Sequence, residues 1–340
     1  MAKRVTARDV AKTLGISTMT VSRALNDKPN VSELTKQKIV ETSRRLGYFP
    51  NHIAKSLVLR KTDTIGVVVP EITHSFFPGI VSGIEEICYE KGYHLILAHS
   101  AEDSKREQDV IYTLTSKQVD GLLISTAQTV EDYTVYKQII QRGLPLVFYD
   151  RCVKGIGASC VSIDDEESAR LITEHLIKHG YSPIAHLAGP QRVLIGKMRM
   201  EGFKKAMVEH QIAIVNELMV EAGLQEEDGF RAMQKILALP ESSWPRAVVA
   251  VNDPAAFGAM KSIYDRGLKI PEDIAIVGFS DDIRAQLMQI PLTTIRQNAY
   301  EVGKRAVDKL ISLIEGENDA IEDIIIKGEL IIRESCGCNR

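Results

Sequence analysis

The sequence predicts a protein of the α/β class that begins with a small all-α helix-turn-helix head. Two observations support this fold class. Within the first 48 residues, short amphipathic segments are separated by glycine, asparagine and proline, which end helices. From about Thr62 onward, strand and helix signals alternate, which is typical of a parallel sheet covered by helices. Because about 280 residues are many for one sheet, we expect this body to form two lobes.

Three helices are expected in the head. The first is capped by Thr6 and ends at Gly15, the second is capped by Ser17, and the third extends from Ser32 to about Leu46. In the second helix, apolar residues at helical spacing would pack on the first helix. Its outward face then carries Thr18, Met19, Ser22 and Arg23. A helix presented in this way fits the major groove of DNA, although a plain helical bundle would show the same pattern.

The distribution of charge separates these two interpretations. Residues 1–61 contain 13 Lys and Arg against 4 Asp and Glu, whereas the whole chain has a formal net charge of −3. The third helix supplies several basic side chains for phosphates: Lys36, Lys38, Arg44 and Arg45. A basic head on an acidic body is typical of a nucleic-acid-binding protein, so the charges favour DNA binding over a structural bundle.

The segment after the head is compatible with a short helix from Asn51 to Leu59. So short a helix is unstable alone in water, and the segment is therefore either a linker or a helix that folds on DNA. The apolar Leu57 between Lys55 and Arg60 has the chemistry of a side chain that wedges into a minor groove, which favours the second interpretation.

In the body, short apolar runs predict strands and amphipathic segments predict helices. Strands are expected at 64–69, 93–98, 119–125, 145–149, 160–163, 184–188, 247–251 and 273–279. The expected helices include 79–91, 107–116, 166–179, 199–210, 254–266 and 300–314. Open α/β sheets bind ligands beyond the carboxyl ends of their strands, so the residues that follow these strands are candidates for a ligand site.

Several motifs resemble those of the lactose-repressor (LacI/GalR) family of bacterial transcriptional regulators, and the resemblance covers nearly the whole chain. The motifs are Val10-Ala11, Gly15-Ile16-Ser17, Thr20-Val21-Ser22-Arg23-Ala24-Leu25-Asn26 and Gly47-Tyr48-Phe49-Pro50-Asn51. The resemblance implies a helix-turn-helix domain at 1–48, a hinge helix and linker at 49–61, and a two-lobed, periplasmic-binding-protein-like core at 62–340. It also implies that the chain crosses between the lobes near 162–165, 290–294 and 322–325.

The resemblance assigns DNA-binding roles residue by residue. Thr18, Met19 and Arg23 would contact base edges, and the donors of Arg23 suit a guanine. Leu57 of the hinge helix would insert between base pairs in the minor groove. The residues expected to contact DNA are Thr6, Ser17, Thr18, Met19, Ser22, Arg23, Asn26, Tyr48, Asn51, Ala54, Lys55 and Leu57.

A second set of residues is expected to bind an effector between the lobes. Arg199 begins Arg199-Met200-Glu201-Gly202-Phe203, which matches a family motif whose arginine reaches the effector. The expected pocket consists of Phe76, Phe77, Asp150, Arg199, Asn252, Ser280 and Gln297. Alternatives remain open for some of them, because Phe76 and Phe77 could belong to the apolar core, and Asp150 could form a surface salt bridge with Arg151.

Two positions depart from the family pattern. Ser280 stands where relatives often have an acid that holds sugar hydroxyls, and Ile195 stands where many have a polar side chain. An arginine without a nearby carboxylate keeps its charge available, which favours an anionic effector, such as a sugar acid or sugar phosphate, over a neutral hexose. Asp150 and Asp281 are the acids that could restore a site for a neutral sugar.

Other functions find little support in the sequence. There is no phosphate-binding glycine loop, nucleophile elbow or clustered metal-ligand motif, so we expect no enzyme activity and no cofactor. The five cysteines are too few and too uneven for a disulfide scaffold, which predicts reduced thiols and a cytoplasmic protein. Cys336-Gly337-Cys338 could bind a soft metal, but a dithiol with no partner ligand favours no metal site. No membrane span or secretion signal is expected.

These observations lead to the hypothesis of a ligand-responsive repressor. It would bind double-stranded operator DNA as a homodimer, because one head spans few base pairs and two heads on a near-palindrome supply the affinity. An effector in the cleft would change the angle between the lobes and so permit or prevent hinge-helix formation. The alternatives are a regulator controlled by a protein coregulator and, with less support, an exported solute-binding protein.

Overall fold

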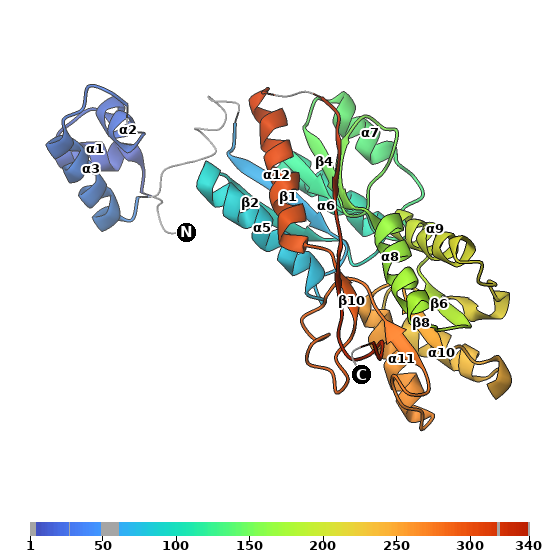
Figure 1. Ribbon diagram of the computed structural model, residues 1–340. Helices are drawn as coiled ribbons and strands as arrows, with labels where there is room; N and C mark the ends of the chain where they lie inside the picture. The colour runs from blue at the N-terminus through green and yellow to red at the C-terminus, as the bar shows by residue number, and fades with distance from the viewer. Residues whose placement is uncertain (1–4, 27, 49–60, 318–319, 339–340) are drawn as a thin grey trace. The chain divides into compact units, whose positions relative to one another are not determined.

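The computed structural model of the protein describes residues 5–26, 28–48, 61–317 and 320–338 (Figure 1). By its internal contacts the chain divides into two units, Met1–Thr62 and Asp63–Arg340. The first unit is all-α and the second is α/β, so the predicted fold class is confirmed.

The first unit is a head of three helices, α1 (Ala7–Leu14), α2 (Thr18–Leu25) and α3 (Glu33–Leu46). All three begin where side chains satisfy free backbone N–H groups. The Asp9 carboxylate accepts the N–H of Thr6 at 2.8 Å. The hydroxyls of Ser17 and Ser32 accept the N–H groups of the residues three positions later, at 3.0 and 3.3 Å. The core of the head is Val10, Ala11, Val21, Ala24 and Ile39.

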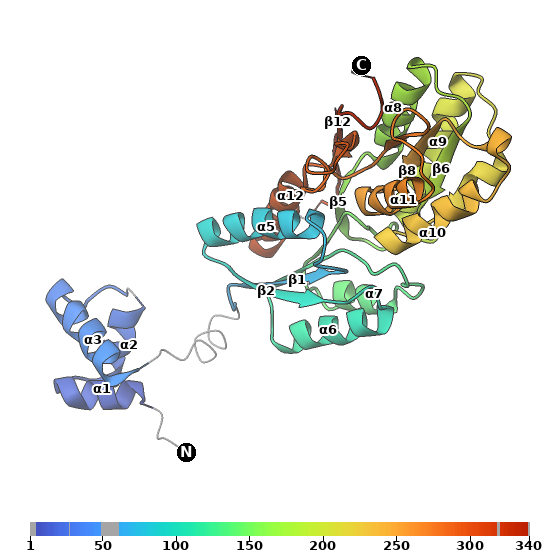
Figure 2. The same ribbon diagram turned by 90° about the horizontal axis from the view of Figure 1, so that it is seen from below.

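The first lobe of the second unit is a six-stranded parallel sheet in the order β11-β5-β4-β3-β1-β2. Its strands are β1 (Thr64–Val69), β2 (His94–His99), β3 (Gly121–Ile124), β4 (Leu146–Tyr149), β5 (Ser159–Ile163) and β11 (Asp323–Ile326). Helices α5 (Phe76–Lys91) and α12 (Ala299–Glu315) cover one face, and α6 (Ser104–Ser116) and α7 (Thr134–Gln141) cover the other (Figure 2). Successive side chains of β1 enter opposite cores, which explains why β1 is apolar throughout.

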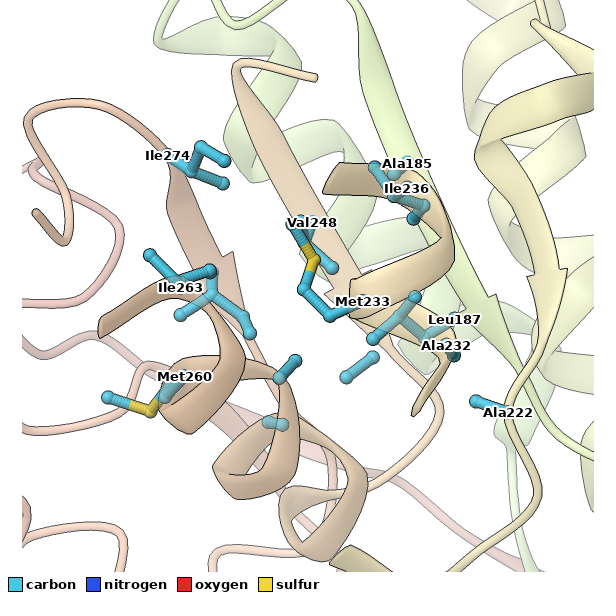
Figure 3. Close-up of a cluster of buried hydrophobic side chains, with 14 of the residues drawn as sticks. Ala185, Leu187, Ala222, Ala232, Met233, Ile236, Val248, Met260, Ile263 and Ile274 are labelled. Carbon is cyan, nitrogen blue, oxygen red and sulfur yellow. The ribbon is translucent and has the colours of Figure 1, made fainter. Parts of the chain in front are cut away.

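The second lobe is a four-stranded parallel sheet in the order β7-β6-β8-β9. Its strands are β6 (Ile184–Ala188), β7 (Met219–Glu221), β8 (Ala247–Ala250) and β9 (Ala275–Val277). Helices α8 (Asp165–Lys178) and α9 (Leu194–Glu209) pack on one face, and α10 (Glu226–Leu237) and α11 (Asp253–Asp265) on the other. Figure 3 shows the core on the α10 and α11 face, where Met233 and Ile263 meet Val248 of the sheet. Two 3-10 turns complete the lobe, η1 (Asn216–Leu218) and η2 (Glu241–Ser243).

Three segments join the lobes. The chain enters the second lobe between β5 and α8, returns between β10 (Thr294–Arg296) and α12, and crosses again between β11 and β12 (Glu329–Ile331). Strands β10 and β12 pair antiparallel and form a ribbon beside the crossings. The first crossing lies within 162–165, whereas the other two lie at 296–299 and 326–329, a few residues after the ranges expected from the resemblance.

One expectation about the cysteines was wrong. Cys152 and Cys160 form a disulfide in the structure, although reduced thiols were expected. The eight-residue separation gave no signal, because the pair is brought together by the turn that connects β4 to β5. Cys88, Cys336 and Cys338 are free thiols. None of the helices in the described ranges is both long and apolar enough to cross a membrane.

Candidate functional site

The exposed face of α2 carries the side chains that were expected to meet DNA bases. Val21 and Ala24 are buried against the other helices, which turns Thr18, Met19 and Arg23 outward. Met19 is 63% exposed. Ser22 is exposed on the same helix. The four side chains predicted to face DNA are therefore all exposed on α2.

Other head residues on the expected list also have structural roles. The Thr6 hydroxyl donates to Asp9 at 2.7 Å, and Ser17 caps α2. Asn26 donates its side-chain amide to the carbonyl of Ser22 at 2.8 Å. Tyr48 packs against the core of the head. The expected hinge residues lie outside the described residues: Asn51, Ala54, Lys55 and Leu57.

A cleft lies between the two lobes of the second unit and contains about 490 Å³ of space, part of it open to solvent. Its lining comes from the segments that follow the carboxyl ends of the strands in both lobes, as open α/β sheets require. All seven expected pocket residues line it. The full lining is Glu71, His74, Phe76, Phe77, Asp150, Arg151, Ile195, Arg199, Leu224, Gln225, Asn252, Pro254, Ser280, Asp282 and Gln297.

Arg199 is held rigidly at the second-lobe side of the cleft. Its Nε donates to Asp165 Oδ1 at 2.8 Å, its Nη1 donates to the Val251 carbonyl at 2.6 Å, and its guanidinium lies 3.7 Å from the centre of the Phe279 ring. A guanidinium has five N–H donors, so these two bonds leave others available to a ligand. The argument that Arg199 lacks a nearby carboxylate was therefore wrong, because Asp165 pairs with it inside the protein.

Asp150 and Arg151 form a buried group, which rules out the alternative of a surface salt bridge. They are 4% and 5% exposed, and Arg151 Nη1 donates to both carboxylate oxygens of Glu102 at 2.8 Å. Burial raises the pKa of Asp150 to about 7, although the charge of Arg151 opposes the rise. A carboxyl group with this pKa can either donate or accept a hydrogen bond near neutral pH.

Glu71 and His74 form a second polar pair in the cleft. His74 Nδ1 lies 3.1 Å from Glu71 Oε2. Burial raises the pKa of Glu71, but hydrogen bonds from His74 and Thr73 outweigh it and lower the pKa to about 2. The same hydrogen bond raises the pKa of His74. These two residues were not expected, because the pair follows β1 in a loop with no motif.

The acids near Ser280 are arranged differently from what was expected. Asp281 accepts from Arg296 Nε at 2.8 Å and from Arg333 Nη2 at 2.6 Å, so it braces the crossing segment and does not line the cleft. Asp282 lines the cleft. Asp281 was therefore the wrong residue to restore an acid to the pocket, and Asp282 takes that place.

Two further pocket residues differ in how freely they can bind a ligand. Asn252 caps α11, accepting from the Ala255 N–H at 2.9 Å and donating to the Leu224 carbonyl at 2.8 Å. Gln297 is 2% exposed, and its Nε2 has no hydrogen-bond partner among the described residues. The buried Nε of Arg151 is also without one. Buried polar atoms of this kind are normally satisfied by hydrogen bonds, whereas the nearest acid to Arg151 Nε, Asp150 Oδ2, lies 3.8 Å away.

The two aromatic residues contribute to the cleft and the core together. Phe77 is buried in the first-lobe core, and Phe76 packs edge-on against it with 5.3 Å between ring centres. Both also line the cleft, so each of these residues belongs to the pocket as well as to the core. The lobes touch at the rim, where Arg192 Nε donates to the Gln128 carbonyl at 2.9 Å.

Two known families match the chain in sequence. Residues 62–334 match periplasmic binding proteins and the sugar-binding domain of the LacI family, and residues 6–51 match bacterial regulatory proteins of the lacI family. The chain is 33% identical over 97% of its length, and 98% of the relative's, to the "Probable HTH-type transcriptional repressor ExuR" of Bacillus subtilis (strain 168).

Solved structures show the same similarity. A lac repressor dimer bound to operator and the anti-inducer ONPF superimposes with a TM-score of 0.87 at 27% identity, covering 98% of this chain and 99% of that one. A complex of the transcriptional regulator CelR with cellobiose has a TM-score of 0.74 at 27% identity, covering 98% of this chain and 100% of that one.

Proposed function

Because the chain belongs to the LacI family of DNA-binding transcriptional repressors, we propose that it acts as a homodimer on a near-palindromic operator and responds to a neutral polyhydroxylated effector in its interlobe cleft. A repressor of this family has a DNA-binding head and a sugar-binding-type domain, and both are present here. The operator arrangement, the dimer and the class of effector are the parts that need support from this chain's own residues.

Support for operator recognition comes from α2. Its exposed face combines Arg23, which can donate two hydrogen bonds to a guanine, with Thr18 and the apolar Met19, which can contact a thymine methyl group. The cationic side chains of α3 can reach phosphates and set the orientation of the head. One such helix contacts only a few base pairs, so a second head is needed for a specific site.

Support for the homodimer comes from the first lobe. Strand β2 is an edge strand of the six-stranded sheet, and Leu97 on it is 44% exposed. The flanking helices add Tyr89, 81% exposed, and Tyr112, 51% exposed. Natural proteins rarely leave an apolar edge strand uncovered, so a second copy of the chain is the partner we propose for this edge.

Support for a neutral effector comes from the charges of the cleft. Each cation that lines it is already paired with a carboxylate: Arg199 with Asp165, Arg151 with Glu102 and His74 with Glu71. Asp150 and Asp282 also line the cleft, and Asp282 is paired with Arg284. A phosphate or carboxylate would therefore meet little uncompensated positive charge, whereas hydroxyl groups can bond to acids and cations alike. Because Asp165 pairs with Arg199, this arginine no longer favours an anionic effector.

The observation that carries the effector proposal is the pair of buried donors without partners, Gln297 Nε2 and Arg151 Nε. Both lie in residues that line the cleft, one at the end of β10 and one after β4. A ligand oxygen that accepts from either donor would supply a hydrogen bond that the protein itself does not make. Phe76 and Phe77 offer apolar surface against which the face of a sugar ring can pack.

The test measures operator affinity by fluorescence anisotropy, using a sequence selected from random DNA. Neutral sugars, sugar acids and sugar phosphates are added in turn, and a neutral sugar should shift the affinity. By linkage, operator DNA must change the affinity for that sugar by the same factor. A shift caused only by an anionic compound would refute the charge argument, and no shift from any compound would favour control by a protein coregulator.

A matched pair of variants tests the site itself. Gln297→Met keeps the shape of the side chain but removes the donor, and it should abolish the response to the sugar while basal operator affinity is kept. Gln234→Met makes the same change on the exposed surface of α10 and should leave the response unchanged. An unaltered response in Gln297→Met would show that the donor is not used.

A further inference from the structure

Three potential metal ligands meet at one place in the second lobe, outside the effector cleft. His175 lies on α8, and Cys336 and Cys338 lie in the segment after β12. His175 Nε2 is 3.5 Å from Cys336 Sγ, and the ligand atoms of all three residues lie within 4.8 Å of one another. The Cys336-Gly337-Cys338 motif was expected to have no partner ligand, and the fold supplies one from 161 residues away.

The turn that carries both cysteines is held in place from several sides. Gly337 has a φ of 70°, a left-handed conformation that suits glycine. Its N–H donates to the Glu334 carbonyl at 2.9 Å, and the hydroxyl of Tyr181 donates to the Cys336 carbonyl at 2.8 Å. The residue before the turn is also held in place, because the Ser335 hydroxyl donates to the Ile276 carbonyl at 2.6 Å. The two thiols are therefore presented by a fixed turn, not by a loose tail.

The spacing of the ligand atoms suits a tetrahedral ion. Zn–S bonds of ~2.3 Å and Zn–N bonds of ~2.0 Å at tetrahedral angles place sulfur and nitrogen ~3.5 Å apart and two sulfurs ~3.8 Å apart. The observed N···S distance is 3.5 Å. The remaining separations, at most 4.8 Å, need only a small rotation of the Cys338 side chain, which is partly exposed.

We propose that His175, Cys336 and Cys338 form a binding site for a thiophilic divalent ion of the zinc class. Two thiolates and an imidazole are ligands that such ions prefer, and two thiol protons pass to solvent when the ion binds. The fourth ligand comes from the solvent side, next to Cys338, because His175 and Cys336 are 8% and 0% exposed. The site adds a property that the proposed repressor function does not require.

The position of the site gives it a structural consequence. The segment that contains the cysteines is bonded to Thr293, the residue before β10, which leads into the second crossing. The Thr293 N–H donates to the Ser335 hydroxyl at 2.8 Å, and the Arg333 N–H donates to the Thr293 hydroxyl at 2.9 Å. An ion held by His175 would join this segment to α8. Because α8 follows the first crossing directly, the ion would couple two of the three connections between the lobes.

The experiment uses the full chain, reduced and free of metal, with the number of accessible thiols counted after denaturation. Zn²⁺ binding is measured by competition with a chromophoric chelator, and Co²⁺ is used as a spectroscopic probe of thiolate ligands. We expect one equivalent of either ion per chain, with the sulfur-to-cobalt charge-transfer absorption and the strong visible absorption of tetrahedral cobalt. Zn²⁺ should also slow amide hydrogen exchange in residues 332–338.

Single substitutions test which side chains bind the ion. Cys338→Ser changes a partly exposed residue that the fold does not bury, so the protein should stay folded and lose the charge-transfer absorption. His175→Gln should lose the tetrahedral signature. Cys88→Ala removes a thiol buried on α5 and should leave metal binding unchanged. Absence of binding in the fully reduced protein would overturn the proposal and leave a hydrogen-bonded thiol–imidazole pair, and binding that survives Cys338→Ser would also overturn it.

Discussion

Replacing Asp150 by Asn should stabilise the protein, and more so as the pH rises. The side chain is 4% exposed, and burial raises its pKa from 3.8 to about 7. A carboxyl group whose pKa is raised by folding is favourable below the unfolded pKa and loses that advantage as pH rises through the folded value. At ~1.4 kcal/mol for each tenfold change in dissociation constant, the cost is about 2 kcal/mol at about pH 5 and about 4 kcal/mol at about pH 8.5.

Asparagine is a suitable replacement because it has nearly the shape of aspartate and tolerates the left-handed backbone of this residue, where φ is 58°. The expected gain in unfolding free energy is at most the full cost of ionising the buried carboxyl group. The amide must still find hydrogen-bond partners, and Arg151 loses a nearby charge. The sign of the change, and its growth with pH, are the firm expectations.

The assay is unfolding of the second unit in urea, followed by far-ultraviolet circular dichroism at about pH 5 and about pH 8.5. The control is Asp109→Asn on the exposed side of α6, which should change stability by less than about 0.5 kcal/mol at either pH. A loss of stability in Asp150→Asn at the higher pH, or a difference from wild type that does not depend on pH, would refute the reasoning. Either result would mean that the carboxylate is ionised and fully compensated in the folded protein.

Two further predictions concern the head and the second-lobe core. Arg23→Ala should weaken binding to the selected operator by roughly 1–3 kcal/mol and binding to unrelated DNA much less, as anisotropy titrations would show, because the exposed Arg23 is assigned to bases; an equal loss on both DNAs would make it a phosphate contact. Gly258→Ala should lower the unfolding free energy by about 1–3 kcal/mol or more, because a Cβ there would overlap the carbonyl oxygen of Glu226 where α10 and α11 meet. Asp265→Ala, exposed on the same helix, is its control, and equal stabilities in urea would show that the helices can separate freely.

The parts of the fold that were predicted from sequence are those whose signal is local and strong. Strands β1 and β6 were placed at their observed bounds, because apolar runs of this kind are buried on both faces of a parallel sheet. Strands β7, β10, β11 and β12 were missed. Each has only three or four residues, several of them half-exposed, so an apolar run such as Ile324–Ile326 is too short to predict a strand.

The residues of the candidate site were also only partly predicted from the sequence. Arg199 was named because a family motif carries it, and Gln297 because it lies near an expected crossing between the lobes; both line the cleft. Asp165, which neutralises Arg199, was missed, since it lies 34 residues away in sequence and is brought there by the first crossing. His175 was missed as a partner of Cys336 for the same reason. Pairings that depend on how two lobes are connected leave no periodic trace in the sequence.

The threefold passage of the chain between the lobes bears on the order in which they can form during synthesis. The first lobe begins at residue 64, yet the helix that covers one face of its sheet and the strand at its β5 edge lie at 299–326. The four-stranded sheet of the second lobe is encoded without interruption between 184 and 277. A ribosome therefore releases the strands and packing helices of the second lobe while Leu123, Val147 and Val161 of the first-lobe sheet still lack α12, the helix that packs over β3, β4 and β5. The first-lobe sheet thus starts before the second-lobe sheet but is completed after it, and this interval is the period in which the nascent chain most needs protection from aggregation.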